Sequence, residues 1–370
     1  MRIALLTTYL PGYRTPLYER LAASHGVEVL CYGGGERYAP PWTVGQLDAQ
    51  IESARFPAAR LDGGAREAFA LGGRYDALIA PYAGRAILPA AYLGARRRHT
   101  PFVLWASVWA HPRSVSNVLA QPLTRQIYRH ADAIVAYGEH VRMFASSIRG
   151  RDDDVFVAPQ SVEPELFGAE VDPARVSAFR RSHGLPEGRP IVLYAGRLVA
   201  EKGVDVLFEA WRRAAPEATL AVIGDGPLAP LARGVPNVLA LGTMQRASLP
   251  LAYAACAFMV LPSVPTPRFR EPWGLVCNEA MHQSRPVLAT SAVGAVAGGL
   301  VRDDVNGVVV APGDPDALGR AIALLLGDAA LRMRLGTAGR RAVAAYNYDA
   351  MAAAYDRALA AGGLRAPTAR

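Results

Sequence analysis

The chain has 370 residues, a length that predicts two domains rather than one. Hydrophobic residues make up 51% of the chain and charged residues 19%, which excludes an intrinsically disordered protein. The formal net charge of +8 favours anionic partners such as nucleotide diphosphates, phospholipid headgroups or nucleic acid, without choosing among them.

Short apolar runs of β type alternate with helical stretches along most of the chain. In the first half the expected strands are 2–9, 27–32, 75–81, 101–107, 133–137 and 155–162. In the second half they are 191–195, 219–223, 238–241, 258–261, 286–290 and 308–310. Apolar runs that are buried on both faces and separated by helices indicate parallel sheets, so the sequence predicts doubly wound α/β domains.

The alternation pauses between about residues 163 and 189, where prolines and charged residues surround one expected helix, 173–183. We interpret this segment as the connection between two domains. The predicted N-terminal domain spans 1–165 and the predicted C-terminal domain spans 186–346. A last helix is expected at 349–361.

The chain has three cysteines, Cys31, Cys256 and Cys277, which are scattered in apolar sequence without CxxC or metal-ligand spacing. We therefore expect reduced thiols and a cytoplasmic protein. No apolar stretch is long enough to cross a bilayer, so contact with the inner membrane surface would be peripheral.

The first stretch that carries chemistry joins the strand ending at Ala195 to the following helix, a position where open α/β sheets bind ligands. It contains Arg197 and Lys202, which is the only lysine of the chain. Two fixed cations beside a helix N-terminus can stabilise the negative charge of a departing diphosphate without a metal ion. The alternative is a glycine turn with two exposed cations, and the presence of the only lysine favours function.

Two further turns follow strands of the same predicted sheet. Gly224 and Gly226 form a glycine-rich strand-to-helix turn, and Thr243 follows the next strand, where it can flank a nucleobase. Turns of this kind are common because the backbone alone can require glycine there, so each is only a weak signal of ligand binding.

Two glutamates, Glu271 and Glu279, stand eight positions apart, the first in a loop and the second in a helix. A helix that starts near Gly274 directs its free N–H groups, with Leu275 and Val276 at its start, towards that loop and a bound phosphate. Glu271 is then expected to accept hydrogen bonds from sugar hydroxyls and Glu279 from ribose hydroxyls. The alternative is a solvated loop glutamate and an ordinary helix-surface glutamate.

Together these stretches resemble the retaining GT-B glycosyltransferases of family 4, the glycosyl transferases group 1. The features that carry the resemblance occur in order: the GRL…EKG turn, the IGDGP turn, the paired glutamates, and the later Asn-Gly…Pro-Gly-Asp of 306–314. The segment 158–167 also looks like the family's approach to the interdomain region. The resemblance runs along nearly the whole chain and is densest from 191 to 315.

The resemblance implies a GT-B fold, with two facing Rossmann-like domains and a crossover helix, 349–365, that returns to the N-terminal domain. The C-terminal domain would bind a nucleotide-sugar donor and the N-terminal domain an acceptor, which is a glycan, a lipid-linked sugar or a small molecule. The implied activity is hexosyl transfer with retention of configuration and without a metal or other cofactor.

By the same analogy, Arg197 and Lys202 contact the diphosphate, while Glu271 contacts the transferred sugar and Glu279 the ribose. His111 resembles the family's histidine near the sugar, although a lone histidine is as often structural.

The loop after the first strand departs from the family. Many relatives have a glycine pair there, whereas this chain has Gly12, Tyr13 and Arg14. Arg14 is a candidate phosphate contact and Tyr13 a candidate acceptor contact, and the departure leaves the acceptor geometry open.

Two acidic motifs have the spacing of metal-dependent transferases, and we reject both as metal sites. Asp152, Asp153 and Asp154 lie in what looks like a solvated loop, and Asp314 with Asp316 looks like a helix N-cap.

Two alternatives stay open. A sugar-nucleotide epimerase uses the same architecture, although the paired glutamates favour transfer. A non-catalytic module that binds anionic ligands is the other, but no basic run or stacking motif indicates nucleic acid. The densest basic cluster, 96–98, is placed at a helix end and can face anionic lipid.

Overall fold

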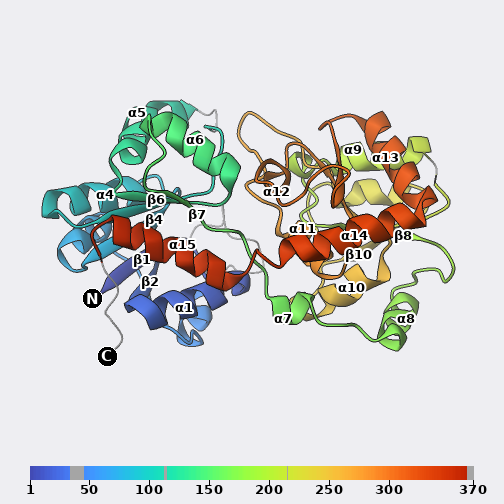
Figure 1. Cartoon of the computed structure of the whole chain (residues 1–370), viewed down its shortest axis with the longest axis horizontal. Coiled ribbons are helices and arrows are strands. Elements are labelled where there is room, and N and C mark those ends of the chain that lie inside the picture. Colours follow the sequence, from blue (N-terminus) through green and yellow to red (C-terminus); the bar gives the residue numbers. More distant parts are fainter. Residues whose placement is uncertain (34–45, 112–114, 215, 365–370) are drawn as a thin grey trace. The chain divides into compact units, whose positions relative to one another are not determined.

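The computed structural model describes residues 1–33, 46–111, 115–214 and 216–364, the side chains of 115–118 excepted. The chain divides into two compact units (Figure 1). One unit, which we call the N-terminal domain, comprises Met1–Pro159 with Tyr348–Arg370. The other, the C-terminal domain, comprises Gln160–Asn347. Each domain contains its own parallel sheet, so the predicted pair of doubly wound domains is confirmed.

The sheet of the N-terminal domain has seven strands in the order β3-β2-β1-β4-β5-β6-β7, with every pair parallel. The strands are β1 Ile3–Thr7, β2 Val27–Cys31, β3 Ala58–Arg60, β4 Ala77–Pro81, β5 Phe102–Ala106, β6 Ala133–Ala136 and β7 Val155–Val157. The sequence did not predict β3, because this three-residue edge strand is only partly buried. The expected strand 155–162 was too long.

Helices cover both faces of this sheet. They are α1 Thr15–His25, α2 Leu47–Glu52, α3 Gly64–Ala70, α4 Ile87–Arg98, α5 Val115–His130, α6 Glu139–Arg149 and α15 Tyr348–Ala361, with 3-10 turns η1 Gly12–Arg14 and η3 Leu71–Gly73. Successive strand residues point to opposite faces, so Ile3 and Leu5 enter one apolar core and Ala4 and Leu6 the other.

The last helix, α15, packs beside α1 on one face of the N-terminal sheet (Figure 1). Its residues Met351 and Tyr355 are fully buried in the same core as Leu17 and Tyr18 of α1. The chain therefore ends in the domain where it began, which confirms the predicted crossover helix. The predicted end of this helix at 365 lies outside the described residues.

The C-terminal sheet has six parallel strands in the order β10-β9-β8-β11-β12-β13. They are β8 Ile191–Ala195, β9 Thr219–Ile223, β10 Val238–Gly242, β11 Phe258–Leu261, β12 Val287–Thr290 and β13 Gly307–Val310. Its helices are α7 Pro164–Phe167, α8 Pro173–Ser182, α9 Val204–Ala214, α10 Leu249–Ala255, α11 Leu275–His282, α12 Gly294–Ala297, α13 Pro315–Gly327 and α14 Ala329–Val343. The 3-10 turns are η4 Ala200–Lys202, η5 Ala229–Gly234 and η6 Arg246–Ser248.

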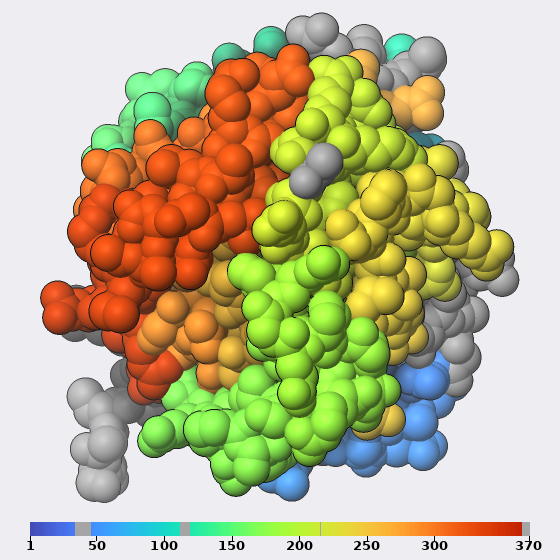
Figure 2. Space-filling view, turned by 90° about the vertical axis from the view of Figure 1, so that its right-hand side faces the viewer, coloured from blue at the N-terminus to red at the C-terminus, as the bar shows by residue number. Residues whose placement is uncertain are grey.

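Segments far apart in the sequence meet on the outside of this domain. Figure 2 shows α9, in yellow-green, beside the orange-red segment that contains α13. An ion pair of 2.9 Å between Arg213 and Asp316 joins the two helices at their exposed edge. Beneath them, Leu207 and Trp211 of α9 and Ile322 of α13 belong to one buried apolar cluster.

The strand order shows where the loops of each sheet diverge, which is the position where ligands are expected. From β8 the chain moves outward to β9 and β10, and it then returns to β11 on the other side of β8. The loops that follow β8 and β11 therefore diverge at their carboxyl ends, which is where doubly wound sheets bind ligands. The same reversal occurs between β1 and β4 in the N-terminal domain.

Candidate functional site

The loops that follow β8 and β9 are packed backbone against backbone. Leu198 N–H donates to the Asp225 carbonyl at 2.8 Å, and the Tyr194 hydroxyl donates to the Arg197 carbonyl at 2.7 Å. A Cβ atom on Gly224 would lie 1.9 Å from the Gly196 carbonyl oxygen, and φ at Gly224 is +133°. The packing of the two loops therefore requires this glycine. A contact of Gly224 or Gly226 with a donor stays a prediction.

The structure brings together two of the expected catalytic residues, Lys202 and Glu271. Lys202 follows β8 and Glu271 follows β11, so both lie at the carboxyl edge where the strand order reverses. The Lys202 ammonium donates to Glu271 Oε2, and the Ser263 hydroxyl donates to the same oxygen at 3.2 Å. The side chains are 14% and 7% exposed, so this is a largely buried ion pair.

Arg197 lies in the same loop but is much more accessible. Its side chain is 49% exposed, and its guanidinium is 3.5 Å from the Glu201 carboxylate. An exposed pair of this length contributes little to stability, so the guanidinium can turn towards a ligand at small cost.

The helix α11 begins immediately after the loop that carries Glu271. Gly274 precedes it with φ of +94°, a left-handed conformation that favours glycine. The next two residues, Leu275 and Val276, are half-buried, and as the first residues of the helix their N–H groups have no acceptor within it. Free N–H groups and the positive end of the helix dipole suit an anion.

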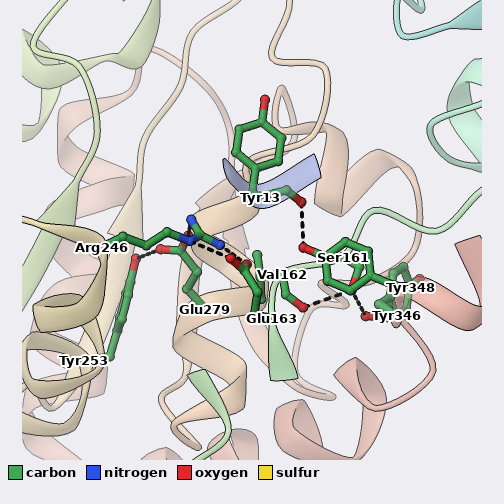
Figure 3. A network of polar contacts seen from close by, with 9 residues as sticks. All are labelled: Tyr13, Ser161, Val162, Glu163, Arg246, Tyr253, Glu279, Tyr346 and Tyr348. Carbon is green, nitrogen blue, oxygen red and sulfur yellow. Dashed lines mark hydrogen bonds and ion pairs between the residues drawn. The ribbon is translucent and has the colours of Figure 1, made fainter. Parts of the chain in front are cut away.

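Glu279 lies on the second turn of α11 and is only 4% exposed. Its Oε2 accepts a hydrogen bond of 2.7 Å from the Tyr253 hydroxyl, and its Oε1 is 3.6 Å from an Nη1 atom of Arg246. Arg246 in turn donates to both carboxylate oxygens of Glu163. Figure 3 shows the Arg246 guanidinium between the two carboxylates. Burial raises the pKa of Glu279, and Arg246 and the Tyr253 hydroxyl oppose this rise.

The comparison with known families concerns this same part of the chain. Residues 176–342 match the model of the family described as glycosyl transferases group 1. This domain belongs to the group 1 glycosyltransferases. The resemblance drawn from the sequence motifs is thereby confirmed.

Two named relatives extend the similarity beyond that segment. The D-inositol 3-phosphate glycosyltransferase of Xylanimonas cellulosilytica is 33% identical over 62% of this chain and 57% of its own. The alpha-D-kanosaminyltransferase of Streptomyces kanamyceticus is 34% identical over 61% of this chain and 60% of its own. The similarity thus spans less than two thirds of the length of these two relatives.

The solved structures confirm the GT-B fold. The crystal structure of Anabaena Alr3699/HepE in complex with UDP matches with a TM-score of 0.81, covering 97% of this chain and 100% of that chain. At 20% sequence identity, this match supports the fold alone. The match covers both Rossmann-like domains, so the GT-B fold extends beyond residues 176–342.

In the N-terminal domain, the loop after β1 forms the short turn η1. Gly12 is exposed, and the Tyr13 carbonyl accepts a hydrogen bond of 2.6 Å from the Tyr348 hydroxyl of α15 (Figure 3). Arg14 is 3% exposed, and its guanidinium carbon lies 5.1 Å from the ring centres of both Trp105 and Tyr137. Arg14 therefore points into aromatic surroundings beneath the loop. Its predicted phosphate contact and the acceptor contact of Tyr13 stay predictions.

His111 lies beyond the end of β5 and is half-buried. Its ring packs edge-on against Phe144 of α6, with ring centres 5.0 Å apart. Burial lowers the pKa of His111, and the positive charge of Arg125 lowers it further. Both effects favour the neutral imidazole, a state in which it can accept as well as donate a hydrogen bond.

Four residues of the site escaped the sequence analysis: Glu163, Arg246, Tyr253 and Ser263. Arg246, Tyr253 and Ser263 belong to no motif, and Arg246 lies 83 positions from Glu163. Glu163 lies within the segment 158–167 that resembles the family's approach to the interdomain region, but no role in the site was predicted for it from the sequence. Thr243, which was predicted beside a nucleobase, is exposed after β10, three positions before Arg246.

The two acidic motifs have structural partners. Asp314 accepts hydrogen bonds from the N–H groups of Asp316 and Ala317, so the predicted N-cap of α13 is confirmed. Asp152 and Asp154 form ion pairs with Arg142 and Arg151 at 3.1 and 3.4 Å. Within the described parts of the chain, no group of three or more histidine, cysteine or acidic side chains is arranged to hold a metal ion.

No helix in the described part of the chain combines the length and the apolar character that crossing a bilayer requires.

Proposed function

We propose that this chain is a retaining, metal-independent glycosyltransferase that moves a hexose-type sugar from a nucleotide diphosphate sugar to an acceptor. The observation that carries the proposal is the Lys202–Glu271 pair, which lies at the carboxyl edge of the C-terminal sheet beside the N-terminus of α11. A cation, a carboxylate and free helix N–H groups are thereby available at one place to a sugar diphosphate.

Each group has a distinct proposed role. The N–H groups of Leu275 and Val276 would bind the diphosphate, and Arg197 and Lys202 would stabilise the charge that it gains as the glycosidic bond breaks. Glu271, held by Lys202 and Ser263, would accept hydrogen bonds from hydroxyls of the transferred sugar. Since protein cations perform the neutralisation, no metal cofactor enters the proposal.

The decisive experiment measures sugar transfer by Lys202→Met and Arg197→Met variants. Screening nucleotide sugars for an increase in melting temperature first identifies the donor, because a ligand that binds the folded state alone stabilises it. Each variant is expected to lose about 100-fold or more in kcat, the effect of removing one group that stabilises developing charge. A chelator is expected to leave the rate unchanged. Full activity in both variants, or strict dependence on added Mn²⁺, would refute the proposal.

The fate of the sugar distinguishes transfer from the alternative epimerase. A transferase releases nucleoside diphosphate and retains the anomeric configuration in a new glycosidic product. An epimerase leaves an isomer of the sugar or sugar nucleotide without glycosylating an acceptor. Analysis of products by NMR separates these outcomes, and a protein that binds the nucleotide without producing either is the non-catalytic module.

The acceptor is proposed to be a glycan, a lipid-linked sugar or a small molecule, and the protein to act in the cytoplasm with reduced cysteines. Peripheral membrane contact is supported by the N-terminal domain, where Leu119 is 78% and Met143 is 65% exposed on α5 and α6. The exposed arginines 96–98 end α4, which contacts α5. Binding to anionic liposomes at low salt tests this contact, and its absence would leave a soluble acceptor.

A further inference from the structure

We propose that Arg246, anchored by Glu163, is a positioning residue: it orients the Glu279 carboxylate for the ribose contact that the family resemblance implies for Glu279. This inference rests on the proposed function, because it concerns how the same site recognises its nucleotide. Arg246 is thus a positioning residue, whereas Glu279 contacts the ligand.

The two carboxylate oxygens of Glu279 have different neighbours: Oε2 accepts a hydrogen bond, whereas Oε1 lies near a cation. Oε2 is engaged by the Tyr253 hydroxyl at 2.7 Å, and Tyr253 is itself fully buried on α10. Oε1 is 3.6 Å from Arg246 Nη1, which is beyond a normal hydrogen bond. The Arg246 guanidinium therefore stabilises the negative charge of the Glu279 carboxylate electrostatically, without a hydrogen bond to Oε1.

The other partners of Arg246 explain why it keeps this distance. Its Nε and Nη2 atoms donate to the two oxygens of Glu163, a bidentate pair that fixes the plane of the guanidinium. The guanidinium carbon also lies 4.9 Å from the ring centre of Phe167.

The segment that carries Glu163 is itself held in place. The Asn278 side chain of α11 donates to the Gln160 carbonyl at 2.8 Å, and the Ser161 hydroxyl donates to the Tyr346 carbonyl at 2.9 Å (Figure 3). Glu163 therefore follows a segment that is tied by hydrogen bonds to α11 and to the backbone at Tyr346.

The charge of the cluster indicates the chemical group that it accepts. Two carboxylates surround one guanidinium, so the cluster of Glu163, Arg246 and Glu279 carries one net negative charge at neutral pH when both carboxyls are ionised. A phosphate would be repelled by that charge, whereas a neutral hydroxyl that donates a hydrogen bond is favoured. The cluster thus suits the ribose and not the diphosphate.

Titration of Glu279 gives the inference a specific signature. The groups that face it are Arg246, Tyr253, Glu163 and, from its own helix, Cys277. Burial raises the pKa of Glu279 and Glu163 adds to the rise, while Arg246 lowers it. Replacing Arg246 by methionine therefore raises the pKa of Glu279 further and shifts the loss of ligand affinity to higher pH.

The test uses UDP, GDP, ADP and dTDP as probes for the wild-type chain, by isothermal titration calorimetry. The ribonucleotide that binds most tightly is then compared with its 2′,3′-dideoxy analogue. The wild-type chain is expected to prefer the ribonucleotide by at least about tenfold, and Arg246→Met is expected to lose this preference. The loss of its affinity with decreasing pH should also begin at a higher pH than the corresponding loss for the wild-type chain with the same nucleotide.

Three further variants separate positioning from a general structural effect. Glu163→Gln should weaken ribonucleotide binding without the new pH dependence, because Arg246 still provides its charge. Arg246→Lys should restore the wild-type pH profile but only part of the affinity. Arg175→Met removes an exposed arginine of the same domain and should bind as the wild type does. Circular dichroism verifies that each variant is folded.

The outcomes distinguish the inference from the function on which it rests. If the wild-type chain binds none of the four nucleotides, the nucleotide site and the proposed function fail, and this inference fails with them. If it binds a nucleotide and Arg246→Met keeps both the ribose preference and the wild-type pH profile, the positioning role is refuted and the proposed function stands. A loss of affinity in Arg246→Met that is the same at every pH and for both sugars also refutes it.

Discussion

The buried ion pair between Lys202 and Glu271 allows a quantitative test of the site's architecture, independent of any substrate. Lys202→Met keeps a side chain of similar length and removes only the cation. Removing one partner of a buried ion pair costs about 3–5 kcal/mol, because the remaining charge loses its compensation. Lys202 is 14% exposed and Ser263 still donates to Glu271, so we expect the lower end, about 3 kcal/mol.

The measurement is urea unfolding at neutral pH, supported by thermal unfolding of the same variants. A loss of about 3 kcal/mol corresponds to a decrease in melting temperature of roughly 6–12 °C for a domain of this size. The double variant Lys202→Met/Glu271→Gln should lose less than the sum of the single losses, because it leaves no buried charge.

Arg197→Met is the matched control, since it removes a cation from the same loop. Its side chain is 49% exposed, so its expected effect is within about 0.5 kcal/mol. A loss below about 1 kcal/mol in Lys202→Met, or single losses that simply add in the double variant, would contradict a buried and coupled pair.

Three further predictions concern other features of the fold. Gly224→Ala should destabilise the C-terminal domain by more than about 2 kcal/mol in urea unfolding, because the new Cβ would meet the Gly196 carbonyl oxygen. Gly234→Ala is the control: the space around its Cβ is open, so the free energy of unfolding should change little. Burial, aided by the positive charge of Arg340, lowers the pKa of His282 from 6.5 to about 4. The neutral buried imidazole therefore contributes to stability above pH 6.5, and this contribution is lost as the pH falls through 4. His282→Gln should reduce the dependence of the unfolding free energy on pH over this range. The three cysteines are buried with raised pKa values, so a thiol reagent should modify them only as fast as the chain unfolds, and rapid reaction of the native protein would contradict their burial.

The sequence determined the two parallel sheets because the information for them is local. Apolar runs such as 191–195 and 258–261 must be buried on both faces, and the helices between them leave parallel pairing as the arrangement that does so. It also placed Gly274 and Glu279 correctly at the start and on the second turn of a helix. The short edge strand Ala58–Arg60 was missed because it lacks a buried apolar run.

The tertiary structure alone decided which charges face one another. Lys202 and Glu271 are 69 positions apart in the sequence. They meet because β8 and β11 are neighbouring strands, so the loops that follow them begin at the same edge of the sheet. Arg246 reaches Glu163 and Glu279 from a third loop, and no motif marks it. Arg14 lies two positions after the exposed Gly12, yet it is buried and contacts Met351 of α15. Contacts of this kind depend on strand order and on the packing of distant segments, and a local pattern of residues does not encode either.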